Sequence, residues 1–168
     1  MLKWFLIFCV FIFLLVTLFL DVFQYFVGSA YREGLHVVPL LLRLWPLMQA
    51  RGVRFVCNAG GLNPMGAAQA VQAALQARGL KARIAVVAGD DVLPRLQDPA
   101  QDFPHLFHGG HVDGVRERLV FANAYLGAAP IVRALEGGAD IVITGRVADA
   151  ALFLGPLVHS LGWKLQDA

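Results

Sequence analysis

Polar and glycine residues that could do chemistry gather at four points of this chain, each directly after a short apolar run. Carboxylates at such points can act as general acids or bases, while glycine turns, amides and arginines can hold an anionic group. We therefore take Asp90 and Asp149 as candidate catalytic residues. The other polar positions are candidate substrate contacts: Asn58, Gly60, Gly61, Asn63, Asp91, Asn123 and Arg146.

The apolar runs before these residues predict short buried strands, and helical patterns alternate with them. Apolar strands that alternate with helices indicate an α/β fold, with a mostly parallel sheet and helices on both faces. The carboxyl ends of parallel strands meet at one edge, where ligands bind, so we expect the candidate residues to line one crevice. The predicted strands are 53–57, 82–88, 119–122 and 140–143, and the predicted helices are 38–50, 64–78, 92–97, 131–136 and a last one from about 147.

Several of these residues also have an ordinary structural interpretation. Asn63 could cap the helix that follows it, and Asp91 could cap the next short helix. Gly60 and Gly61 could serve only a tight turn, with a backbone cradle for a phosphate or carboxylate as the functional interpretation. Asn123 could tie down a loop instead of touching a substrate.

The charged candidates are harder to interpret as purely structural. Asp90 lies beside Asp91, and adjacent carboxylates repel unless a cation, donors or water are near. Arg146 could pair with Asp149 at the surface. Its place directly after a buried strand and Gly145 favours contact with an anion.

Histidines recur at every third residue in one loop, at His105, His108 and His111, with Asp113 close behind. Imidazoles and a carboxylate could hold zinc or iron, but no helical pattern puts them on one face, so we predict no metal site. His159 is interpreted as a half-buried helix residue and not as a catalyst. The chain has no P-loop, no Gly-x-Gly-x-x-Gly and no Gly-x-Ser-x-Gly, and it identifies no cofactor.

Composition divides the chain into an apolar leader at 1–34 and an α/β domain at 35–168. The run 4–20 is apolar except for Thr17, which predicts a transmembrane helix that would anchor the protein in a membrane. A cleaved signal peptide, with its site at 28–30, and an atypical leader on a truncated domain are the alternatives. The formal net charge is +2 and the basic residues are scattered, which argues against nucleic-acid binding.

Four sequence blocks stand in a fixed order: NAGGLNP at 58–64, GDD at 89–91, NAYLGA at 123–128 and GADIVITGRVAD at 138–149. Together they resemble the N-terminal domain of the acyclic terpene utilisation family, over about 38–163. The resemblance implies a cytoplasmic protein in the breakdown of acyclic terpenoids such as citronellol and geraniol, which runs through CoA thioesters. Family members begin with a further strand and continue beyond this range, so the resemblance implies a fragment.

We therefore expect a catabolic protein that binds or converts an acyclic terpenoid-derived acid or its CoA thioester. In this hypothesis the 58–61 turn and Arg146 hold the anionic group, and Asp90 or Asp149 transfers a proton. The alternatives are a non-catalytic subunit or scaffold of a terpenoid catabolic complex, and an inactive membrane-tethered fragment. The expected partners are the small-molecule substrate, a membrane through 4–20 and a second copy of the chain, with no nucleic acid.

Overall fold

The computed structural model describes residues 37–107 and 109–165, which form an α/β fold around a parallel sheet. Its strand order is β1-β3-β2, and β3 pairs in parallel with both neighbours. The parallel sheet predicted from the apolar strand pattern is thus confirmed. The strands are β1 (Phe55–Cys57), β2 (Ile84–Val87) and β3 (Ile141–Thr144).

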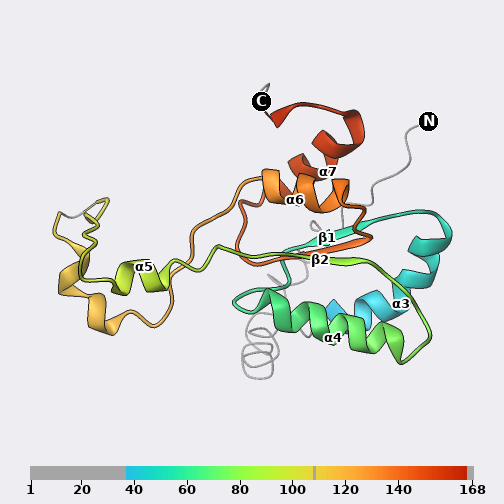
Figure 1. The fold of residues 1–168 in the computed structure, drawn as a ribbon, viewed down its shortest axis with the longest axis horizontal. Coiled ribbons are helices and arrows are strands. Elements are labelled where there is room, and N and C mark those ends of the chain that lie inside the picture. Colours follow the sequence, from blue (N-terminus) through green and yellow to red (C-terminus); the bar gives the residue numbers. More distant parts are fainter. Residues whose placement is uncertain (1–36, 108, 166–168) are drawn as a thin grey trace, which may run out of the picture.

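Helices cover both faces of this sheet, as Figure 1 shows. One pair, α3 and α4, packs below the sheet in that view, and a second pair, α6 and α7, packs above it. Their bounds are α3 (Val37–Ala50), α4 (Pro64–Gln76), α6 (Ala129–Glu136) and α7 (Ala151–Leu161).

A long excursion between β2 and α6 leaves the sheet and stands away from it on the left of Figure 1. We call this segment, residues 91–125, the arm. It holds the short helix α5 (Leu93–Gln97) and the 3-10 turns η1 (Val112–Gly114) and η2 (Arg116–Arg118).

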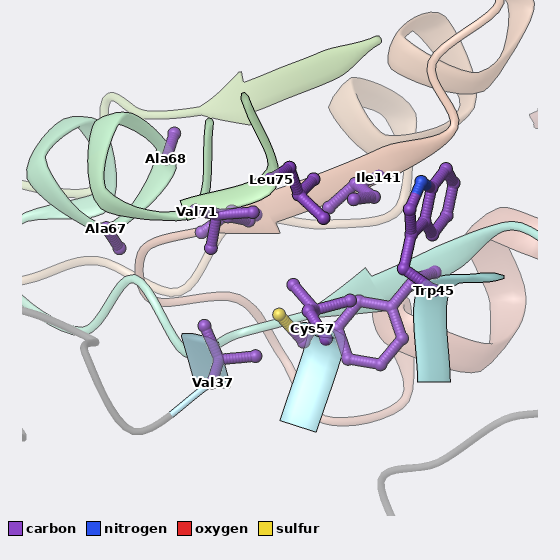
Figure 2. Packing of buried hydrophobic residues seen from close by; sticks show 11 residues of the cluster. Val37, Trp45, Cys57, Ala67, Ala68, Val71, Leu75 and Ile141 are labelled. Carbon is purple, nitrogen blue, oxygen red and sulfur yellow. The ribbon is translucent and has the colours of Figure 1, made fainter. Parts of the chain in front are cut away.

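The larger core cluster fills the space between the sheet and the pair α3 and α4 (Figure 2). Leu41 of α3 and Leu75 of α4 are almost fully buried in it, and each such side chain contributes about 1.5–3 kcal/mol. All four residues of β3 are buried, because this strand is central and has helices on both faces. Figure 2 labels Val37, Trp45, Cys57, Ala67, Ala68, Val71, Leu75 and Ile141 of this cluster.

Both ends of α4 are set by residues that are known to start or stop helices. Asn63 is the N-cap, and its Oδ1 accepts a hydrogen bond from the amide of Gly66 at 2.9 Å. Pro64 occupies the first helical position, where no N–H is needed. Beyond the helix, Gly79 is in the left-handed region with φ of 67°. The cap predicted for Asn63 is confirmed.

One prediction about the elements was wrong. The run 119–122 was predicted as a strand, but it lies in the arm without strand pairing, and Val120 and Phe121 are 83% and 64% exposed. A short apolar run looks alike in a buried strand and in an exposed loop, so periodicity could not separate them. The last helix, predicted from about 147, begins at Ala151 and continues through Gly155 and Pro156 as one helix, α7. Pro156 removes only one backbone donor, and Gly155 lets the helix pack closely on Ile131.

Within 37–107 and 109–165, no helix is both long enough and apolar enough to cross a membrane. The expected membrane anchor, the run 4–20, lies outside the described residues.

Candidate functional site

The carboxyl ends of the three strands meet at one edge of the parallel sheet, which we call the candidate site. Asn58 follows β1, Asp90 follows β2 and Arg146 follows β3. Backbone and side-chain bonds tie these ends together. The amide of Gly60 donates to the Thr144 carbonyl at 3.1 Å, and the amide of Arg146 donates to Asp90 Oδ2 at 2.8 Å. The shared edge expected from the sequence is therefore present.

Asp90 is buried at this edge, with only 4% of its surface exposed. Its Oδ2 accepts one bond from the Arg146 amide and a second from Asn123 Nδ2 at 2.9 Å. Gly145 makes room for the carboxylate, because a Cβ added there would lie 2.7 Å from Asp90 Cγ. Backbone and amide donors therefore stabilise the buried carboxylate.

Asn63 has the capping role that was weighed against substrate contact, whereas Asp91 precedes Val92, the N-cap of α5. Asp91 is exposed, and its Oδ1 accepts a bond from the amide of Leu93 at 2.9 Å, at the start of α5. Asp91 also forms an isolated antiparallel bridge with Asn123, which closes the root of the arm. Asn63 caps α4. Substrate contact by these three residues stays a prediction.

The glycine turn after β1 uses most of its own donors. The Gly60 amide is bound to Thr144, and the Gly61 amide donates to the Asn58 carbonyl at 3.3 Å. Within the described ranges, the amides of Ala59 and Leu62 have no hydrogen-bond acceptor. A ligand oxygen at this turn would therefore meet the Ala59 and Leu62 amides and the exposed Asn58 side chain, while the two glycines shape the backbone.

Gly60 has a steric reason to be glycine. A Cβ added there would lie 2.5 Å from the Thr144 carbonyl oxygen and 2.6 Å from Pro64 Cβ. Gly61 has a conformational reason, since its φ is +53°.

Arg146 and Asp149 are both exposed at this edge. In the part of the chain that the structure describes, the Arg146 guanidinium has no hydrogen bond and no ion pair, so the surface pair with Asp149 is not formed. A planar guanidinium without a protein partner can bind a carboxylate or phosphate through two parallel hydrogen bonds. The exposed carboxylate of Asp149, between β3 and α7, can exchange a proton with a bound ligand.

His105 and His111, which were considered as metal ligands, lie in the arm. His111 Nδ1 is 2.5 Å from Asp102 Oδ2, and His105 Nδ1 accepts a bond from the Phe107 amide at 3.1 Å. Residue 108 lies outside the described residues. Among 37–107 and 109–165, no three metal-binding side chains form a group that could hold an ion.

His159 is partly buried on α7, as the sequence suggested, and it lies by the opposite end of the sheet from the candidate site. Arg54, just before β1, places Nη1 at 2.7 Å from His159 Nε2 and at 3.1 Å from the Leu135 carbonyl. Burial lowers the pKa of His159, and the positive charge of Arg54 lowers it further, while Glu136 opposes this shift. The sequence analysis did not identify Arg54 as the partner of His159. The only signal for it in the sequence is its place before a buried strand.

Thr144 comes directly after the predicted strand 140–143, but it was not among the candidate site residues. It is fully buried at the end of β3, and its hydroxyl donates to the Gly145 carbonyl at 2.9 Å. Its own carbonyl accepts the Gly60 amide, so it joins the β1 turn to the end of β3. The structure makes Thr144 the last residue of β3.

The family model described as "Acyclic terpene utilisation family protein AtuA" matches residues 30–168. The match includes every residue of the candidate site. No curated protein and no solved structure matches the chain.

Proposed function

Because this chain belongs to the acyclic terpene utilisation family AtuA, with its general role in acyclic terpene utilisation, we propose that the candidate site binds or converts an acyclic terpenoid-derived acid or its CoA thioester. One observation carries the proposal. Arg146 is exposed at the carboxyl edge of the parallel sheet, and its guanidinium has no partner in the described ranges. Ligands of open α/β sheets bind at this edge.

Such a substrate has an anionic or strongly polar head and an apolar tail. Its carboxylate, thioester oxygen or phosphate would bind the Arg146 guanidinium. The amides of Ala59 and Leu62, in the turn after β1, would be neutral donors to the same group. Of the two expected proton-transfer residues, we assign the role to Asp149. Its carboxylate is exposed, whereas Asp90 is buried and already accepts two hydrogen bonds.

Arg146→Ala tests this proposal. A hydrogen bond to a charged group is worth about 1.5–3 kcal/mol, so binding should weaken about 10- to 100-fold. Binding of geranic acid and of geranoyl-CoA would be measured by calorimetry, with decanoic acid and coenzyme A as comparison ligands. Because the side chain is exposed, the melting temperature should stay within about 2 °C.

Arg133→Ala is the matched control, since Arg133 is an exposed arginine on α6. It should leave binding unchanged. Equal weakening in both variants would mean that the whole surface charge, and not Arg146, attracts the ligand. A melting temperature that falls in step with binding would assign Arg146 a structural role.

A second candidate is a non-catalytic subunit of a terpenoid catabolic complex. The observation that favours it is that most polar candidates are engaged in internal bonds, which leaves few side chains for chemistry. These engaged residues are Asn63, Asp90, Asp91 and Asn123. Tight binding of geranoyl-CoA by the wild type would count against this candidate, and an Asp149→Asn variant with unchanged turnover would remove the proposed acid–base role.

A further inference from the structure

Two segments distant in sequence converge on Asp90. Its backbone carbonyl accepts the Ala124 amide at 2.7 Å, and its Oδ2 accepts the Asn123 side chain and the Arg146 amide. Asn123 and Ala124 belong to the root of the arm, and Arg146 begins the loop after β3. One buried residue at the end of β2 therefore holds both the arm and the segment that presents Arg146.

The contacts of Asp90 are of a kind that holds neighbouring backbone segments in place. Both donors to Oδ2 approach a carboxylate, and charge-assisted bonds are shorter and stronger than neutral ones. Gly145 packs against the carboxylate so closely that no larger residue fits without a shift. In the described ranges Asp90 has no ion pair, so donors from the two neighbouring segments compensate its buried charge.

We propose that Asp90 is a positioning residue, which fixes the backbone at Arg146 and so directs the guanidinium toward the anionic group of the ligand. It is not the group that transfers a proton. This inference rests on the proposed function, in which Arg146 is the anion contact. It also predicts coupling between the root of the arm and the anion contact, because Asn123 and Arg146 share one acceptor oxygen.

A purely structural Asp90 would act on stability alone, whereas a positioning residue acts on the ligand through Arg146. A double-mutant cycle in the full chain separates the two cases. Asp90→Ala should weaken geranoyl-CoA binding at least fivefold in the wild-type background. It should have no further effect in the Arg146→Ala background. Asp90→Asn should restore most of the affinity, since its amide oxygen can replace Oδ2 as the acceptor.

Glu117→Ala is the control, because it removes one negative charge from an exposed side chain of η2 that is not a candidate site residue. It should leave binding within about twofold, as expected of a screened surface charge. A second readout is hydrogen exchange at the Arg146 amide, which should become faster in Asp90→Ala and stay slow in Glu117→Ala.

Asp90→Ala risks misfolding, so Asn123→Ala provides an independent variant. It removes one donor to Oδ2 and leaves the backbone bonds of the arm root, Val92 to Ala122 and Ala124 to Asp90, in place. It should weaken binding about two- to fivefold in the wild-type background and not at all in the Arg146→Ala background.

Equal losses from these variants with and without the Arg146 side chain would overturn the positioning role and leave the proposed function standing. Unchanged binding in Arg146→Ala, or no binding of geranoyl-CoA to the wild type, would overturn both.

Discussion

Gly60→Ala is the sharpest test of how the candidate site is built. The added Cβ would lie 2.5 Å from the Thr144 carbonyl oxygen, 2.6 Å from Pro64 Cβ and 2.7 Å from Pro64 Cα. Real Cβ atoms do not approach other heavy atoms this closely, so the turn or its neighbours must move. Neither neighbour moves easily, because Thr144 ends the fully buried central strand and Pro64 is a rigid ring at the start of α4.

Overpacking of this kind costs about 1–3 kcal/mol. For a chain of this size each kcal/mol lowers the melting temperature by about 2–4 °C, so we expect a decrease of about 2–12 °C. The shift would also lengthen the bond from the Gly60 amide to the Thr144 carbonyl, now 3.1 Å. Thermal and urea unfolding, followed by circular dichroism, would measure both the midpoint and the free energy of unfolding.

Gly127→Ala is the control, since nothing lies within 4 Å of a Cβ added there and its φ is not positive. Its stability should stay within about 0.5 kcal/mol of the wild type. An unchanged melting temperature in Gly60→Ala would refute the reasoning, as would an equal decrease in both variants.

Two further predictions concern the opposite end of the sheet and the arm. Burial and Arg54 lower the folded pKa of His159, so in the pH range just below the ordinary value of about 6.5 the unfolded chain binds more protons. The free energy of unfolding should therefore be highest above about pH 6.5 and should fall as the pH is lowered through this window. His159→Gln should reduce the pH dependence of the urea midpoint between pH 5 and 7. An unchanged slope of urea midpoint against pH would exclude His159 as the cause. In the arm, Arg116 is only 13% exposed and donates to the carbonyls of Asp98 at 2.7 Å and Gln101 at 2.8 Å. Arg116→Met should raise the rate of thermolysin cleavage in the arm about tenfold, because it removes charged hydrogen bonds worth about 1.5–3 kcal/mol and so increases local opening. Arg118→Met, the control, should leave the cleavage rate unchanged. Equal cleavage rates in the two variants would contradict an anchoring role for Arg116.

Much of the fold could be predicted because its signals are local. The residues Asn63-Pro64 mark a helix start through capping chemistry, and Gly79 marks the stop through its left-handed conformation. Apolar runs that alternate with helices indicated a parallel sheet, since a strand covered on both faces must be apolar throughout. The shared edge of Asn58, Asp90 and Arg146 then followed from strand direction alone.

The environment of each side chain could not be predicted in this way. Asp90 and Asp91 are neighbours of the same type, yet one is buried and the other exposed. The donors that stabilise Asp90 come from Asn123 and Arg146, which are 33 and 56 residues away in the chain. The strand prediction for 119–122 was wrong for the same reason, because no local pattern shows that these residues lie in the arm, away from the sheet.

The amino-acid sequence by itself thus determined the family, through four sequence blocks in a fixed order. It also determined the class of fold and the edge at which polar residues meet, because these depend on periodicity and strand direction. Only the tertiary structure decided which of those residues are engaged and which are open. It occupied the Gly60 and Gly61 amides, buried Asp90 and left the Arg146 guanidinium exposed, because hydrogen-bond partners and solvent access are set by segments that meet only after the chain has folded.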